Sequence, residues 1–334
     1  MGLERDRKAE HIALALDQKV QSDHRYFDDY TFEHIALPEI DHNEIDISTT
    51  FLDKAIQSPI LISCMTGGTA SARAINEHLA LAAEKMGVVL GVGSQRKAIE
   101  DPSQVETFQI RQLAPTIPIL ANLGAVQLNY GFGLDECELA IQMVDADALV
   151  FHLNPLQEVI QPEGQTNFRG LLQKMGQIAK QLSVPVIVKE IGCGISESVA
   201  KNIADQGISF IDTAGVGGTS WARIEAARAN DAEVGELFAH WGIPTPESIQ
   251  AVKKVEGVTV IGSGGVKSGL DVAKAIALGA DLVGLAAPFL QPALESAAAV
   301  EQQIREINRA LTITMFCVGA ASIKDLQSTP LLRV

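Results

Sequence analysis

The amino-acid sequence predicts an α/β protein built as a (β/α)8 TIM barrel, with an N-terminal extension and a long loop after the sixth strand. Eight short apolar segments alternate with longer amphipathic ones. Their apolarity is continuous, as expected for parallel strands that are buried on both faces. Glycine-rich turns follow five of the eight segments, spread along the chain. A doubly wound sheet would instead carry GxGxxG after its first strand, and the sequence there, Met65-Thr66-Gly67-Gly68, does not match.

The predicted strands are the eight apolar segments, at residues 59–64, 88–92, 118–122, 148–152, 185–189, 209–212, 258–261 and 281–285. Helical patterns lie between them, for example at residues 72–86, 168–182 and 270–278. A further helix is predicted to begin at Thr245-Pro246, because proline is favoured at the first helical position.

Two segments fall outside this repeat. Residues 58–334 are assigned to the barrel, and residues 1–57 form an extension that packs on the barrel or closes over it. The loop at residues 215–243 contains both tryptophans, and loops of this length are usually functional. We expect both segments to lie over the C-terminal face, where the active sites of such barrels are found.

Composition excludes several classes of protein. The 334 residues include 26 basic and 41 acidic side chains, a net charge of −15, which argues against nucleic acid as the main partner. No apolar run reaches the roughly 18–20 residues that span a bilayer, and the charged N-terminus lacks the apolar core of a signal peptide. The four cysteines show no CxxC spacing. We therefore expect a cytoplasmic protein with free thiols.

Glycine-rich turns after the last two strands predict a phosphate site. Residues 261–269 carry four glycines and open a helix, and residues 284–288 open another. Backbone N–H groups at helix N-termini bind anions, and glycine lets the backbone approach closely. Barrels recurrently bind phosphate after their seventh and eighth strands.

Polar residues end five of the apolar strands, at Thr66, at residues 94–96, at Asn122, at residues 152–154 and at Lys189. Such groups are costly to bury without partners. Because these strand ends converge on one barrel mouth, they predict a cofactor and substrate site there. Taken alone, Lys189 is either a Schiff-base nucleophile or a fixed cation beside a cofactor.

Nine motifs in order carry a resemblance to a known family. They are Arg7-Lys8 with His11, Met65–Gly68, Ser94-Gln95-Arg96, residues 121–124, residues 152–158, residues 161–164, residues 188–190, residues 217–221 with Glu225, and residues 262–265. The match that they define extends from residue 5 to beyond residue 290. The sequence resembles the type 2, FMN-dependent isopentenyl-diphosphate delta-isomerases.

The resemblance implies an isomerase of isoprenoid precursor biosynthesis that interconverts isopentenyl and dimethylallyl diphosphate. It implies reduced FMN as the acid and base, Mg2+ on the diphosphate, NADPH as reductant, and a homotetramer or homo-octamer. The implied FMN contacts are Cys64, Met65, Thr66, Ser94, Asn122, Lys189 and Thr219. The implied phosphate contacts are Gly264, Gly265, Lys267, Ala286 and Ala287.

The resemblance also assigns the substrate and catalytic residues. The implied substrate contacts are Arg7, Lys8, His11, Ser94, Gln95, Arg96, His152, Asn154 and Gln157, with Glu158 as the metal ligand. The expected catalytic residues are Gln157, Lys189, Glu225 and His152. In this scheme Lys189 is a fixed positive charge that favours the anionic reduced flavin. Gln157 orients the reacting end of the substrate, and Glu225 adjusts flavin protonation.

Three other functions are compatible with a barrel of this kind. An FMN-dependent 2-hydroxy acid oxidase would need a histidine base and an arginine pair near the seventh strand, where His240 is the histidine available. An NAD-linked nucleotide dehydrogenase would need a cysteine nucleophile in a loop, for which Cys193 is the candidate. A flavin-storage protein would not need nine motifs of polar strand ends.

Overall fold

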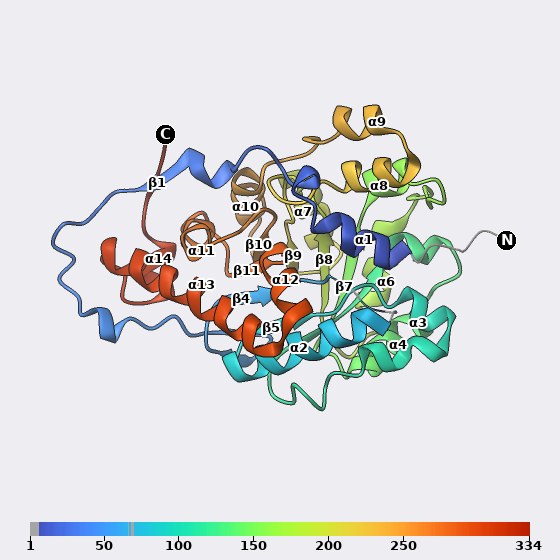
Figure 1. Ribbon diagram of the computed structural model, residues 1–334, viewed down its shortest axis with the longest axis horizontal. Helices are drawn as coiled ribbons and strands as arrows, with labels where there is room; N and C mark the ends of the chain where they lie inside the picture. Colours follow the sequence, from blue (N-terminus) through green and yellow to red (C-terminus); the bar gives the residue numbers. More distant parts are fainter. Residues whose placement is uncertain (1–6, 66, 68–69) are drawn as a thin grey trace.

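The computed structural model describes residues 7–65, 67 and 70–334, apart from a few side chains near residues 7–9, 18 and 70–71. Eight parallel strands close into a barrel in the order β10-β11-β4-β5-β6-β7-β8-β9, which confirms the predicted fold class (Figure 1). Each predicted strand is present within two residues of its expected ends. The strands are β4 (Ile60–Ile62), β5 (Val89–Gly91), β6 (Ile119–Gly124), β7 (Ala148–Leu153), β8 (Val186–Glu190), β9 (Phe210–Asp212), β10 (Thr259–Ser263) and β11 (Leu282–Leu285).

Strand register aligns polar residues at one end of the barrel. Gly124 of β6 pairs with His152 of β7, His152 pairs with Lys189 of β8, and Lys189 pairs with Asp212 of β9. These positions follow apolar stretches that are buried against the surrounding helices. The polar groups therefore meet at the C-terminal ends of adjacent strands.

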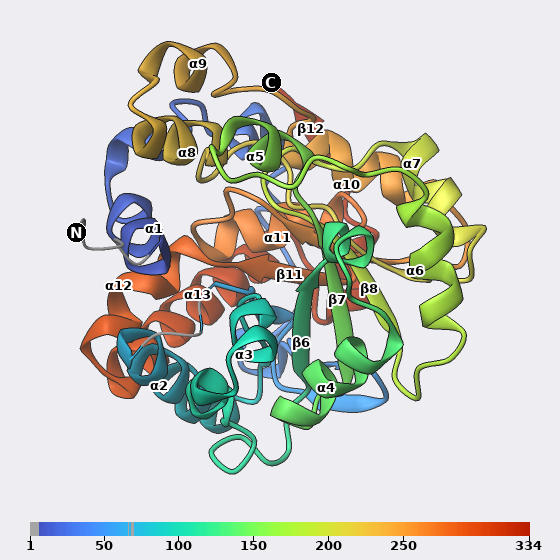
Figure 2. The ribbon, with the colours of Figure 1, turned by 90° about the vertical axis from the view of Figure 1, so that its right-hand side faces the viewer.

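Helices surround the barrel, as Figures 1 and 2 show. They are α2 (Ala70–Met86), α3 (Arg96–Glu100), α4 (Leu134–Val144), α5 (Pro155–Ile160), α6 (Leu171–Ala179), α7 (Glu197–Ala204), α10 (Thr245–Lys253), α11 (Gly269–Ala277), α12 (Ala287–Glu295), α13 (Ala297–Cys317) and α14 (Ile323–Gln327). The longest, α13, buries Val300, Ile304, Ile307, Leu311 and Met315. This spacing places one apolar stripe against the barrel's other helices.

The chain before the barrel wraps around it and reaches both of its ends. Helix α1 (Arg7–Ala15) lies beside α8 (Trp221–Ala229), and β1 (Tyr30–Phe32) pairs with the C-terminal β12 (Leu331–Arg333). Strands β2 (Thr49–Phe51) and β3 (Lys54–Ile56) form a hairpin. Phe51 and Ile56 of this hairpin pack among the strand side chains inside the barrel, such as Leu120. The hairpin therefore closes the N-terminal end of the barrel.

The long connection after β9 contains two helices, where the sequence analysis expected a loop. Helix α8 (Trp221–Ala229) is capped by Ser220, and α9 (Ala232–Leu237) is capped by Asp231. Asn230 lies between them in the left-handed region, with φ 56°, and ends α8. The first helix is rich in alanine, the best helix former, and that signal was missed.

No helix in the described ranges is long and apolar enough to cross a membrane.

Candidate active site

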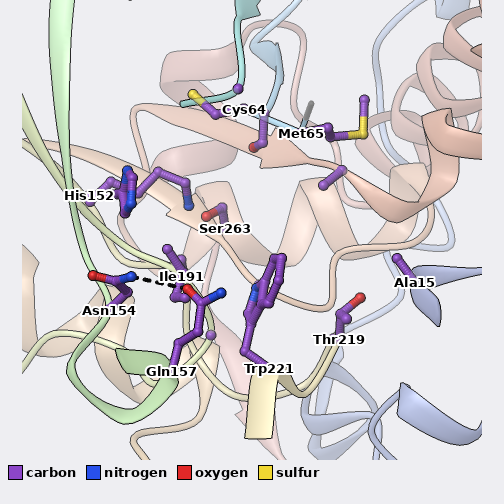
Figure 3. Close-up of a pocket in the computed structure, with 18 of the residues that line it drawn as sticks. Ala15, Cys64, Met65, His152, Asn154, Gln157, Ile191, Thr219, Trp221 and Ser263 are labelled. Carbon is purple, nitrogen blue, oxygen red and sulfur yellow. Dashed lines mark hydrogen bonds between the residues drawn. The ribbon is translucent and has the colours of Figure 1, made fainter. Parts of the chain in front are cut away.

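A cavity of about 290 Å³ opens at the C-terminal ends of the strands. Most of the predicted site residues line it, and they come from every part of the barrel mouth. The predicted residues that do so are His11, Cys64, Met65, Ser94, Arg96, Asn122, His152, Asn154, Gln157, Glu158, Lys189, Thr219, Gly264, Gly265, Lys267, Ala286 and Ala287. Figure 3 shows Asn154, Gln157 and Trp221 projecting into the cavity opposite Cys64 and Met65.

Two residues expected in the site do not line the cavity. Gln95 is fully buried, and its side chain donates to the Ala140 carbonyl at 2.8 Å and accepts from the Asn122 N–H at 2.9 Å. It therefore supports Asn122 from behind, although we expected it to contact substrate. Glu225 is also fully buried and reaches the cavity only through Gln157 and His11. Thr66 and the side chains of Arg7 and Lys8 lie outside the described part of the chain.

His152 and Asn122 form a pair across neighbouring strands. His152 Nδ1 lies 2.8 Å from Asn122 Oδ1, so Nδ1 carries the proton and donates to the amide oxygen. The opposite ring nitrogen, Nε2, lies near Gly124, where an added Cβ would approach it to 3.1 Å. Glycine at this position gives the imidazole room at the cavity wall.

The positive charge of Lys189 is balanced by the carboxylate of Asp212. Its Nζ lies 3.4 Å from Asp212 Oδ2 and donates to the Glu190 carbonyl at 2.9 Å. Asp212 is buried, and its other oxygen accepts a short hydrogen bond from the Ser263 hydroxyl. A buried cation with a buried counter-ion is fixed in place. The ammonium group thus sits at the cavity wall with a defined direction.

Gln157 is held at both ends of its amide group. Asn154 Nδ2 donates to Gln157 Oε1 at 3.0 Å, and Gln157 Nε2 donates to Glu225 Oε1 at 2.7 Å. Burial raises the pKa of Glu225, but hydrogen bonds from His11, Gln157 and Arg228 outweigh it and lower the pKa to about 2. The ionised carboxylate can only accept, and it therefore determines which way the Gln157 amide points.

Glu158 is surrounded by amide groups. Its carboxylate accepts from Asn154 Nδ2 at 2.8 Å, Gln161 Nε2 at 2.7 Å and the Gln165 N–H at 2.6 Å. The amide oxygens of Asn154 and Gln161 are buried beside it, and neither has a hydrogen-bond partner among the described residues. Carboxylate and amide oxygens are hard donors of the kind that Mg2+ prefers, and both amides here turn their nitrogens toward Glu158. The described residues contain no cluster of three or more His, Cys, Asp or Glu suited to a metal.

Burial determines the protonation state of Cys64, whose thiol lies at the cavity. Cys64 follows β4 and lines the cavity wall. Its burial raises the pKa to about 11, although the charge on Lys189 partly opposes this. The thiol is therefore neutral at physiological pH and packs as a small apolar group.

The two helices that follow β10 and β11 begin differently. At α11 the Ser268 side chain accepts from the Asp271 N–H, and the Asp271 carboxylate takes the N–H groups of Lys267 and Ser268. At α12 no side chain caps the helix, and Ala286 and Ala287 face the cavity. Pro288 has no N–H, and the Phe289 N–H donates to the Ala286 carbonyl at 2.9 Å. The N–H groups of Ala286 and Ala287 are therefore the ones that this helix start offers to an anion.

Glycine is required in the turn after β10. Gly264 and Gly265 have φ angles of 109° and 69°. A Cβ on Gly264 would lie 2.2 Å from the Gly215 carbonyl oxygen, and one on Gly265 would lie 2.3 Å from the carbonyl carbon of Gly217. Only glycine allows these two backbone segments to pack against each other at the cavity wall.

Several residues at the cavity were not among the predicted site residues. Gln21 reaches the cavity from the N-terminal segment, where its amide donates to Thr219 Oγ1 at 3.0 Å. Ile12 and Ala15 of α1 contribute apolar surface. Glu190 shapes the turn after β8, because its carboxylate accepts the N–H groups of residues 191–193. Continuous motifs contain no signal for a contact such as that between Gln21 and Thr219, which are far apart in the sequence.

Comparison with known proteins agrees with this architecture. Solved structures of the lactate oxidase of Pediococcus acidilactici and of a mandelate oxidase variant superpose with TM-scores of 0.69 and 0.66. They cover 92% and 97% of this chain, and this chain covers 84% and 92% of theirs, at 20% and 16% identity. At such identities the likeness concerns the fold alone. The family model described as FMN-dependent dehydrogenase matches residues 11–115 and 153–333. Fold and cavity thus define a barrel of the flavin-dependent class.

Relatives in sequence narrow this class. Proteins named isopentenyl-diphosphate delta-isomerase from Nostoc sp. and Synechococcus sp. are each 49% identical over 98% of this chain and over 95% and 96% of their own lengths. One from Rickettsia africae is 46% identical over 97% of this chain and 96% of its own length. The chain belongs to the flavin-dependent isopentenyl-diphosphate delta-isomerase family.

Proposed function

We propose that this protein interconverts isopentenyl diphosphate and dimethylallyl diphosphate with bound reduced FMN and Mg2+. The observation that supports the proposal is that three chemical features meet at one cavity. These are a cation at Lys189 with a buried counter-ion, a buried carboxylate at Glu158, and an amide at Gln157 oriented from both sides. Family membership supplies the reaction that uses all three.

The residues that follow β10 and β11 fit the phosphate group of FMN. The uncapped start of α12 and the glycine turn at residues 264–265 would hold the FMN phosphate by backbone N–H groups. Lys189, Met65, Ser94 and Asn122 line the same cavity and would contact the flavin ring. When bound in its reduced form, FMN supplies an electron-rich face and a nitrogen that exchanges a proton with the allylic carbons.

The chain fits Mg2+ through Glu158. Mg2+ usually takes one or two carboxylates and completes its shell with water and substrate phosphates. Glu158 would be that carboxylate, and the diphosphate would supply further oxygens. His11, Arg96 and His152 line the same cavity and would neutralise the remaining phosphate charge.

The remaining side chains place and protect the reacting end of the substrate. Gln157 presents its second amide N–H to the cavity, because Glu225 and Asn154 occupy the other positions. Trp221, Ile12 and Ala15 line the cavity with apolar surface. They would exclude water from the cationic carbon that forms when the double bond is protonated.

Other parts of the proposal rest on the sequence alone. We propose that residues 1–57 act as an extension that packs on or closes over a barrel of residues 58–334. We also propose NADPH as the reductant, a homotetrameric or homo-octameric assembly, and a place in the cytoplasm.

An anaerobic assay tests the proposal. Protein loaded with FMN, reduced with dithionite and supplied with Mg2+ should convert isopentenyl diphosphate to dimethylallyl diphosphate, followed by NMR. The purified protein should bind FMN and not FAD. Failure to form product in the reduced state would disprove the proposed activity. Unchanged turnover after Mg2+ is removed with EDTA would disprove the metal's part, and stoichiometric FAD would disprove the cofactor.

A further inference from the structure

Arg228 contacts carboxylates from three separate segments and lies outside the cavity. Its guanidinium nitrogens lie 2.5 Å from Glu225 on the same helix, 3.2 Å from Glu10 on α1 and 2.9 Å from Glu163 after α5. The side chain is 13% exposed. The planar guanidinium group can serve several carboxylates at once, which an ammonium group cannot do with the same geometry.

These contacts join the three elements at one edge of the cavity mouth. Helices α1 and α5 both pack against α8, and the views in Figures 1 and 2 place α1 next to α8. His11 strengthens the same junction, because it lies 3.0 Å from Glu225 Oε1 and packs edge-on against Trp221 at 5.2 Å. Arg228 therefore stands where the N-terminal helix meets the barrel's long connection.

The local charges make Arg228 hard to replace. Three carboxylates converge on this point and Arg228 contacts all of them, while His11, when protonated, adds positive charge beside Glu225. Glu225 has no exposed side-chain surface. Removing one partner from a buried ion pair leaves an uncompensated buried charge, which is strongly unfavourable. Without Arg228, the Glu225 carboxylate would turn toward solvent, and this movement would release the Gln157 amide.

We propose that Arg228 is a positioning residue for the isomerisation, which clamps α1 to α8 and holds Glu225 against the Gln157 amide. The inference rests on the role of Gln157 in the proposed function. The clamp itself is a property of the chain that can be observed without turnover. Arg228 does not touch the cavity, so its effect on the reaction passes through Glu225 and Gln157.

The test compares Arg228→Met, Glu225→Gln and the double variant. Arg228→Met should lower kcat at least about tenfold, since small misplacements of a positioning group cost one to two orders of magnitude. FMN should remain bound, because the phosphate end of the cavity is formed by β10 and β11. In the double variant the amide that replaces the Glu225 carboxylate can still accept from Gln157 and needs no counter-ion. The kcat of the double variant should therefore return to within about threefold of that of Glu225→Gln.

Hydrogen exchange provides the second measurement and does not depend on turnover. Amides of residues 7–15 should exchange faster in Arg228→Met than in wild type. Arg305→Met is the matched control, since Arg305 is half exposed and pairs with Glu301 on α13, far from the cavity; it should change neither kcat nor exchange at residues 7–15.

Three results would overturn the inference. They are wild-type kcat in Arg228→Met, unchanged exchange at residues 7–15, or a double variant no more active than Arg228→Met. Loss of FMN from Arg228→Met would also contradict it, because the arginine would then support the fold as a whole. An inactive wild type would disprove the proposed function, while the exchange result would still decide whether the clamp exists.

Discussion

Glu225 should make the folded protein sensitive to acid, by an amount that its surroundings determine. Its pKa is lowered to about 2 from an ordinary value of 4.5, because the hydrogen bonds from His11, Gln157 and Arg228 outweigh the effect of burial. A lowered folded-state pKa stabilises the fold above the unfolded value of 4.5. That stabilisation is lost as the pH falls toward 2. Linkage gives a contribution of about 3 kcal/mol at pH 6 and about 2 kcal/mol at pH 3.5.

Glu225→Gln isolates this contribution from the other carboxylates. The substituted amide does not titrate, so the difference in free energy of unfolding between wild type and variant should shrink by about 1 kcal/mol from pH 6 to pH 3.5. Urea titrations followed by tryptophan fluorescence, with FMN bound in both proteins, measure this difference. Glu138→Gln, on the exposed side of α4, should give a difference that does not change with pH. A constant difference for Glu225→Gln as well would refute the reasoning.

Three further predictions concern the cavity. Lys189→Ala should cut turnover and weaken the anionic form of reduced FMN, seen in its absorbance, because a nearby positive charge is removed; wild type should leave no adduct after borohydride treatment, and a trapped adduct at Lys189 would restore the Schiff-base alternative. Arg7→Ala with Lys8→Ala should raise KM for isopentenyl diphosphate at least about tenfold, a loss near 1.4 kcal/mol, without changing FMN affinity; an unchanged KM would remove both residues from the substrate site. Gly265→Ala should weaken FMN binding at least about tenfold because its Cβ would strike Gly217. Gly170→Ala has a similar φ of 71° with nothing within 4 Å and should bind FMN like wild type; equal loss in both variants would point to backbone strain alone.

The barrel was predictable from the sequence because its signal is local. Each strand is a continuous apolar segment. Few structures other than a parallel strand buried on both faces fit such a segment. The polar strand ends were predictable for the same reason, since a polar residue directly after a buried strand of a barrel lies at the barrel mouth. His152, Lys189 and Asn122 are of this kind.

The remaining errors concern the direction of side chains and contacts between distant segments. Gln95 follows Ser94, but it stands at the start of α3, where the turn from strand to helix and not the pleat decides its direction. Glu225 lies one turn after Trp221 on α8, yet only Trp221 reaches the cavity. Arg228 finds its partners near residues 10 and 163, and no spacing within one motif relates these positions.

The charged groups of the site form two layers, the side chains that line the cavity and the acidic side chains behind them. The chain carries a net charge of −15, so it repels a diphosphate at long range. Among the described residues that line the cavity, Glu158 is the one carboxylate, while Lys189, Arg96 and Lys267 bring positive charge. Asp212 and Glu225 stand behind this lining and orient Lys189 and Gln157 without facing the substrate. A cavity with low-dielectric walls focuses the field of its own charges. The cavity can therefore attract an anion within a strongly acidic protein, because the acids that position its groups are buried and paired.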